Sequence, residues 1–220
     1  MIDWQKIDTV MLDMDGTLLD LHFDNYFWLH YVPQHYATKH QLPILEANHI
    51  LRNRFAAESG TLNWYCVEYW SEQLHLDIAS LKQDISHLIT IRPFVIEFLT
   101  ELADQPQQII LVTNAHRKSL NIKLATTGIS KWFNEIIVSH DFHAPKEKQE
   151  FWQQLYLLHP FNTERTLLID DTESVLESAQ NYGIKNLITL LQPDSKQTKK
   201  TKSKFPCIHH FDEIMPSSTQ

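Results

Sequence analysis

Five short runs of apolar, β-prone residues constrain the fold of this chain more than any other feature of its sequence. The runs lie at residues 8–13, 109–113, 135–139, 166–170 and 186–191. Their interiors are continuously apolar, which is typical of strands buried on both faces of a parallel sheet. A further short run at residues 207–209 is predicted as a last strand.

Helical patterns separate these runs from about residue 90 onward. Pro93 is expected to open the first helix, because its fixed φ suits the first helical position, and Gly128 is expected to end the second. The apolar residues that recur at helical spacing are Phe94, Phe98 and Leu102; Leu120 and Leu124; Phe151 and Leu155; and Val175, Ala179 and Tyr182. Strands that alternate with helices predict an α/β fold, a doubly wound parallel sheet.

The chain between the first two runs is much longer than a simple crossover requires. This segment contains helical patterns of its own. They are Ile44, Ala47, Leu51 and Phe55 after Pro43, and then Trp64, Val67, Trp70 and Leu74. We therefore predict an α-helical cap at residues 20–90, inserted into an α/β core formed by residues 1–19 and 91–220.

Composition excludes several classes of function. The formal net charge is −8, with a pI near 5.9, so a nucleic-acid polymer is not expected as a partner. The polar N-terminus does not resemble a signal peptide, and no apolar run reaches the length of a membrane span. A cytoplasmic enzyme is therefore expected. Cys66 and Cys207 are predicted to be reduced and mostly buried thiols, and the lysine-rich residues 194–204 a solvated loop.

Polar residues follow the predicted strands at the edge where a doubly wound sheet binds its ligands. They are Asp13 and Asp15, Thr113 and Asn114, Lys146, and Asp170 and Asp171. Carboxylates this close repel one another, so a cation is expected among them. Because all the available ligands are oxygens, a hard ion is expected, and the predicted cofactor is Mg²⁺.

These residue types suit phosphoryl transfer. Asp13 can attack phosphorus to form an aspartyl-phosphate, and Asp15, two residues on along extended backbone, can serve as the acid and base. Gly16 permits a sharp departure of the chain after Asp15. Lys146 and the Thr113 hydroxyl can hold the phosphoryl oxygens. Asn114 is also predicted to bind the substrate or its phosphate.

Four segments resemble the motifs of the haloacid dehalogenase superfamily, in its phosphatase branch with a helical type-one cap. They are Asp13-Met14-Asp15-Gly16-Thr17-Leu18, Leu111-Val112-Thr113-Asn114, Pro145-Lys146 and Ile169-Asp170-Asp171. The resemblance implies that Asp13 is the nucleophile and Asp15 the acid/base. It also implies that Mg²⁺ is bound by the Asp13 carboxylate, the Asp15 main-chain carbonyl and Asp170, with Asp171 acting through water. Dehalogenase members lack the second acid of the first motif, so Asp15 disfavours dehalogenation.

The segments around these motifs resemble bacterial GMP/IMP 5′-nucleotidases of the same superfamily. The resemblance rests on residues 19–28, 62–66 and 113–116, and it implies purine nucleoside monophosphates as substrates. Phe23, Tyr26 and Tyr65 are expected to contact the substrate, because they fall in loop or edge segments. The other aromatic residues between 23 and 70 are assigned to the interior of the cap. His116, three residues after Thr113, is expected to line the site.

Three alternatives to a purine nucleotidase stay open at this stage. The first is a phosphatase for another small metabolite, such as a sugar phosphate. The second is a phosphomutase, which returns the phosphoryl group to its product. The third is a catalytically silent protein that keeps the fold to bind a partner. The third is disfavoured because every charged motif position is filled.

Overall fold

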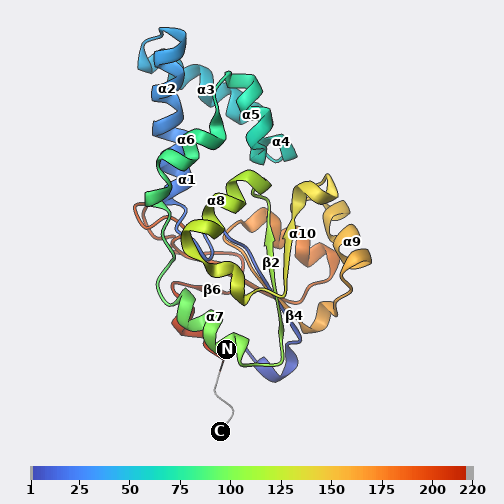
Figure 1. Ribbon diagram of the computed structural model, residues 1–220. Coiled ribbons are helices and arrows are strands. Elements are labelled where there is room, and N and C mark those ends of the chain that lie inside the picture. The colour runs from blue at the N-terminus through green and yellow to red at the C-terminus, as the bar shows by residue number, and fades with distance from the viewer. Residues whose placement is uncertain (1, 217–220) are drawn as a thin grey trace.

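The structure is a computed structural model that describes residues 2–216, and within them six parallel strands form one sheet (Figure 1). The strand order is β3-β2-β1-β4-β5-β6. The strands are β1 (Thr9–Leu12), β2 (Gln108–Thr113), β3 (Glu135–Val138), β4 (Thr166–Ile169), β5 (Asn186–Leu190) and β6 (Cys207–Ile208). The order grows outward from β1 in one direction and from β4 in the other, so the predicted doubly wound α/β fold is confirmed.

Helices cover both faces of this sheet because side chains alternate along each buried strand. Val10 and Leu12 of β1 belong to the hydrophobic cluster under α7 and α8, whereas Met11 belongs to the cluster under α9 and α10. These helices are α7 (Val95–Ala103), α8 (Arg117–Thr127), α9 (Gln149–Leu158) and α10 (Glu173–Tyr182). Short 3-10 turns are η1 (Trp4–Lys6), η4 (Ile129–Trp132), η5 (Ser139–Phe142), η6 (Thr163–Arg165) and η7 (Phe211–Ile214).

The chain between β1 and β2 is helical, and Figure 1 shows these helices at the opposite end of the molecule from α7 and the N-terminus. They are α1 (His22–Tyr26), the π-helical η2 (Phe27–Tyr31), α2 (Val32–His40), α3 (Ile44–Glu58), α4 (Leu62–Tyr65), α5 (Val67–Leu74), α6 (Ile78–Asp84) and η3 (Ser86–Leu88). The segments that enter and leave them form an antiparallel bridge between Leu19 and Ile91. A division into core and cap near residues 20 and 90 agrees with this bridge and stays a prediction.

The helix predicted from Pro93 begins later than expected. Val95 is its first residue, and Phe94 before it has a left-handed backbone with φ of 64°. Arg92, which is buried, donates to the carbonyls of Pro193 and His209 and so fixes the chain just before the helix. A turn at residues 93–94 therefore separates Arg92 from α7.

The helix predicted around Trp64 and Trp70 is two helices instead of one. Cys66 is extended between α4 and α5, and its sulfur caps α5 by accepting from the Tyr69 N–H. Trp70 is consequently buried at 2% exposure, whereas Trp64 is 38% exposed.

The thiol of Cys207 is exposed, so the expectation of a buried thiol is wrong at this position.

Two further expectations concern the lysine-rich loop and membrane-spanning helices. Residues 194–204 contain no helix or strand, as predicted, although Asp194 is buried and accepts from Asn25 at 2.7 Å. Among residues 2–216, no helix combines the length and apolar character that crossing a membrane requires.

Candidate active site

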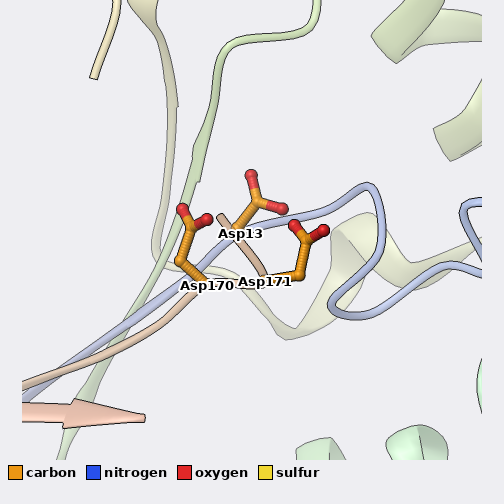
Figure 2. A group of neighbouring side chains, drawn as sticks. All are labelled: Asp13, Asp170 and Asp171. Carbon is orange, nitrogen blue, oxygen red and sulfur yellow. The ribbon is translucent and has the colours of Figure 1, made fainter. Parts of the chain in front are cut away.

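Three buried carboxylates meet at the carboxyl edge of the sheet (Figure 2). Strands β1 and β4 pair in register, Leu12 beside Ile169, so Asp13 and Asp170 leave the sheet at the same level. Asp171 follows directly, and one oxygen from each of the three acids lies within 4.8 Å of the others. Clustered, buried, oxygen-only ligands are what a hard divalent cation requires, so the donor set fits Mg²⁺.

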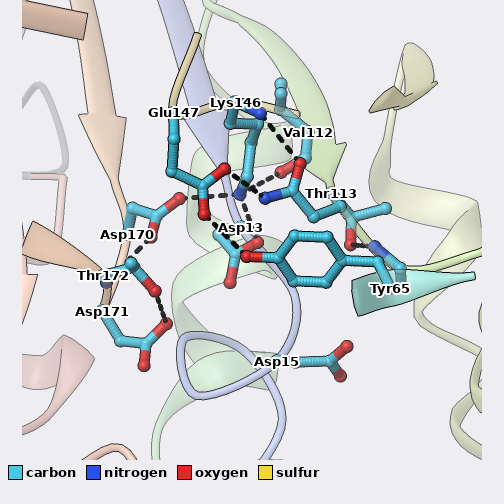
Figure 3. Close-up of polar contacts among 12 residues, drawn as sticks. Asp13, Asp15, Tyr65, Val112, Thr113, Lys146, Glu147, Asp170, Asp171 and Thr172 are labelled. Atoms are coloured by element: carbon cyan, nitrogen blue, oxygen red, sulfur yellow. Dashed lines mark hydrogen bonds and ion pairs between the residues drawn. The ribbon is translucent and has the colours of Figure 1, made fainter. Parts of the chain in front are cut away.

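The Lys146 ammonium lies among these acids (Figure 3). It donates to Asp13 Oδ1 at 2.5 Å, to Asp170 Oδ2 at 2.7 Å and to the Val112 carbonyl at 3.0 Å. An ammonium has three donors, and all three are used here. A phosphoryl oxygen bound to Lys146 would therefore have to replace one of these partners, and the contact of Lys146 with phosphate stays a prediction.

The electrostatics of the cluster follow from burial and crowding. Burial raises the pKa of Asp13 to about 6. The positive charge of Lys146 opposes this rise, and repulsion from Asp170 adds to it. Burial, then repulsion from Asp170 and Asp13, holds the pKa of Asp171 well above its ordinary value. Burial lowers the pKa of Lys146, but the adjacent carboxylates outweigh it and the net shift is upward. An excess of buried negative charge beside one lysine favours the binding of a further cation.

The Asp15 side chain points away from this cluster and pairs with a different lysine. Lys123 of α8 donates to Asp15 Oδ1 at 2.6 Å. Burial raises the pKa of Asp15 to about 6, and the Lys123 charge opposes that shift. The predicted metal contact of Asp15 is through its main-chain carbonyl, so the position of its carboxylate leaves that prediction untested.

Gly16 makes the close approach between the Asp15 segment and Asp171 possible. Its φ of +86° lies in the left-handed region, and a Cβ at this position would lie 2.6 Å from Asp171 Oδ2. Only glycine avoids both penalties.

The residues after β2 hold the site together from the other side. Thr113 Oγ1 accepts from the Ala115 N–H, which leaves its hydroxyl hydrogen available to a ligand. Asn114 accepts from the Lys146 N–H at 3.0 Å and donates to Glu147 Oε2 at 3.0 Å. Asn114 therefore orients residues 146–147, and its contact with the substrate stays a prediction.

Tyr65 comes from the inserted helices and contacts the core directly. Its hydroxyl donates to Glu147 Oε1 at 2.6 Å (Figure 3). Glu147 thus receives one bond from the inserted helices and one from Asn114. The sequence interpretation missed Glu147, although its position next to Lys146 after the third strand was an available signal.

A cavity of about 630 Å³ lies between the core and the inserted helices. Asp13, Asp15, Thr113, Asn114, His116, Lys146 and Asp171 line it from the core side, and Tyr65 from the other. Trp28, Phe55, Trp64 and Trp70 contribute an aromatic wall. The cavity is large enough for a small metabolite, which matches the usual size of such sites.

Two of the three aromatic residues singled out from the sequence do not line this cavity. Phe23 is buried at 2% exposure and stacks on Phe27, and both Phe23 and Tyr26 lie in α1 and not in a loop. Trp28 and Trp64, which were assigned to the interior of the cap, line the cavity instead. The expectation for Phe23 and Tyr26 was wrong because residues 22–26 form a helix, whose inner face buries Phe23.

Fold and site together define a hydrolase with an acid-rich centre at the carboxyl edge of a doubly wound sheet. The family model of haloacid dehalogenase-like hydrolases matches residues 10–189, and the chain belongs to this family. The predicted membership of the superfamily, and the predicted enzyme class of phosphatase, are confirmed.

Individual relatives extend this result. The chain is 40% identical to the GMP/IMP nucleotidase YrfG of Escherichia coli (strain K12) over 98% of its own length and 97% of the relative's. A HAD phosphatase from Thermococcus onnurineus superposes with a TM-score of 0.78 at 18% identity, covering 94% of this chain and 96% of that one. The HAD-hydrolase YfnB of Bacillus subtilis, solved bound to magnesium, superposes at 0.63 with 18% identity over 94% and 96% of the two chains.

Proposed function

We propose that the protein is a Mg²⁺-dependent 5′-nucleotidase that hydrolyses purine nucleoside monophosphates such as IMP and GMP. One observation carries the chemistry: Asp13 lies buried beside Lys146 at the base of the cavity, within reach of two further carboxylates. The 40% identity to a GMP/IMP nucleotidase over nearly the whole chain supports the choice of substrate.

The proposed reaction gives each of these side chains one task. The Asp13 carboxylate attacks phosphorus, the bond from phosphorus to the nucleoside 5′-oxygen breaks, and Asp15 gives that oxygen a proton. Asp15 then takes a proton from a water molecule, which attacks the aspartyl-phosphate and releases phosphate. Lys146 orients Asp13 through its ion pair, and the Thr113 hydroxyl is available to donate to a phosphoryl oxygen.

The carboxylates of Asp13 and Asp170, and the main-chain carbonyl of Asp15, would hold Mg²⁺, with Asp171 acting through water. The bound ion would neutralise the charge of the phosphoryl oxygens. In this structure Lys146 already offsets part of the negative charge of Asp13 and Asp170.

Aromatic residues on the cavity wall support selection of a purine. Tyr65 and Trp64 of α4 both line the cavity, and Trp64 is 38% exposed. Stacking a base on an aromatic ring is worth about 1–3 kcal/mol, and a purine presents more area than a pyrimidine. IMP and GMP should therefore be better substrates than CMP or UMP, and far better than hexose phosphates.

The test is phosphate release from a panel of nucleoside monophosphates and hexose phosphates, with Mg²⁺ and with EDTA. Asp13→Asn should abolish turnover, because an amide is a poor nucleophile. Asp104→Asn, at an exposed acid after α7, serves as the matched control and should retain wild-type rates. Hexose phosphates as the best substrates would refute the purine assignment, and an active Asp13→Asn variant would refute the mechanism.

A further inference from the structure

We propose that Lys123 positions the Asp15 carboxylate for proton transfer, and that Asp24 of the inserted helices holds Lys123 in place for this task. This role rests on the proposed function, because it concerns the acid of that reaction. Neither lysine of the network described below was expected from the sequence.

The observation is a chain of ion pairs that runs from the inserted helices into the active site. Lys82 of α6 donates to Asp24 Oδ1 at 2.7 Å, and Lys123 of α8 donates to Asp24 Oδ2 at 2.5 Å. The same Lys123 ammonium donates to Asp15 Oδ1 at 2.6 Å. Two ammonium groups thus alternate with two carboxylates, so the four formal charges balance.

The surroundings of the two ammonium groups leave them few alternative partners. Both lysines are almost fully buried, Lys82 at 2% and Lys123 at 1% exposure. The ring of Phe23 lies 5.0 Å from the Lys82 nitrogen and 5.4 Å from the Lys123 nitrogen. A buried ammonium beside aromatic rings is stabilised by its carboxylates and not by water, so its position is fixed.

This arrangement suits an acid that must reach a leaving group. Lys123 occupies Oδ1 of Asp15, and Asp15 is among the residues that line the cavity. Because one carboxylate oxygen is held, the direction of the other is set as well. A proton donor held in a fixed direction transfers its proton far more effectively than a freely rotating one.

The network also makes the direction of Asp15 depend on the inserted helices. Asp24 belongs to α1 and Lys82 to α6, whereas Asp15 and Lys123 belong to the core. Lys123 is held between Asp24 and Asp15, so the ammonium is correctly placed only when α1 is in its observed position. The acid is therefore assembled by contacts from both parts of the molecule.

The experiment compares two leaving groups in single-turnover phosphorylation by the full-length protein with Mg²⁺. The leaving group of IMP is inosine, whose 5′-oxygen must receive a proton. The leaving group of p-nitrophenyl phosphate is p-nitrophenolate, which is stable without a proton. Lys123→Met removes the ammonium but keeps the length of the side chain. It should slow transfer from IMP by about 10–100-fold and transfer from p-nitrophenyl phosphate by less than about threefold, since misplacing a catalytic group costs on the order of 10²-fold.

Lys82→Met is the matched control, because it removes a buried ammonium from the same network without a contact to Asp15. It should lower the unfolding temperature without changing the ratio of the two rates. A double-mutant cycle completes the test: in an Asp15→Asn background, Lys123→Met should cause no further loss with IMP.

Equal losses on both substrates, or an undiminished loss in the Asp15→Asn background, would overturn the role of Lys123. If Lys123→Met does not fold, Asp24→Asn keeps the shape of its side chain and weakens the same contact; an unchanged rate ratio in that variant would overturn the proposal equally. The wild-type protein reports separately on the proposed function. Absence of IMP hydrolysis by the wild type refutes that function, whereas IMP hydrolysis with no change of ratio in the variants refutes only this inference.

Discussion

Replacing Gly16 by Ala should damage catalysis far more than stability. The left-handed backbone at φ of +86° costs an L-residue about 1–2 kcal/mol. In a chain of this size that lowers the unfolding temperature by about 2–8 °C. The added Cβ would also lie 2.6 Å from Asp171 Oδ2, whereas ordinary contacts begin at 3.4 Å. The Asp171 carboxylate must therefore withdraw, and displacing a group at a reacting centre by about 1 Å can cost on the order of 10²-fold in rate.

Gly128→Ala is the matched control for this change. Gly128 has φ of +66° at the end of α8, but nothing lies within 4 Å of a Cβ built there. Both variants should therefore lose similar stability in thermal unfolding. Only Gly16→Ala should lower kcat/KM for IMP, with a weaker response to Mg²⁺ in titrations of activity. Equal kinetic losses in the two variants, or normal kinetics in Gly16→Ala, would refute the reasoning that Asp171 must stay in place.

Three further changes probe the neighbouring contacts. Lys146→Met leaves the buried Asp13 and Asp170 carboxylates unpaired and should cost about 3–5 kcal/mol in urea unfolding; a loss below about 1 kcal/mol would contradict the ion-pair geometry. Tyr65→Phe removes the bond to Glu147 but keeps the ring, so KM should rise by similar factors for IMP and p-nitrophenyl phosphate. Tyr65→Ala also removes the ring and should cause a further loss for IMP alone. A loss of IMP selectivity in Tyr65→Phe would show instead that the hydroxyl contacts the base. Burial, then the nearby His116, lowers the pKa of His140 from 6.5 to about 4, so the unfolded chain binds the extra proton and stability falls as pH drops through this range. His140→Leu should remove about 1 kcal/mol of the stability difference between about pH 7 and pH 5, after allowance for the exposed part of the ring, and an unchanged difference would contradict the assignment.

The sheet could be predicted from the sequence because each strand carries its own signal. Val10, Met11 and Leu12 are apolar in succession, and burial on both faces is what such a run requires. The beginning of α7 could not be predicted in the same way. Its position depends on Arg92, whose partners lie about a hundred residues further along the chain. Contacts of that range leave no local pattern around Pro93.

The acids of the site were also predictable, because each stands at the end of a strand that reaches the same edge. The partners of those acids were not. Lys123 follows Leu120 by three residues and so lies on the buried face of α8, which was a usable signal. A lone lysine in a helix is nevertheless most often solvated. Asp15 and Asp24 lie beside Lys123 only in the folded protein. Glu147 and Tyr65 are likewise brought together only by the fold.

The central place of β1 in the sheet has a consequence for how the chain folds as it is synthesised. Thr9 pairs with Gln108 on one side and with Thr166 on the other, so the first strand made has no partner strand until β2 has left the ribosome. The helices made in between pack largely on one another, as Trp28 does on Phe55 and Trp70. These helices can become compact while β1 still lacks a partner strand, because local contacts form before distant ones. Limited proteolysis of ribosome-bound chains long enough for residue 88, but not β2, to have left the exit tunnel should therefore cut around residues 9–12 while residues 22–88 are already protected; equal protection of both segments would contradict this order.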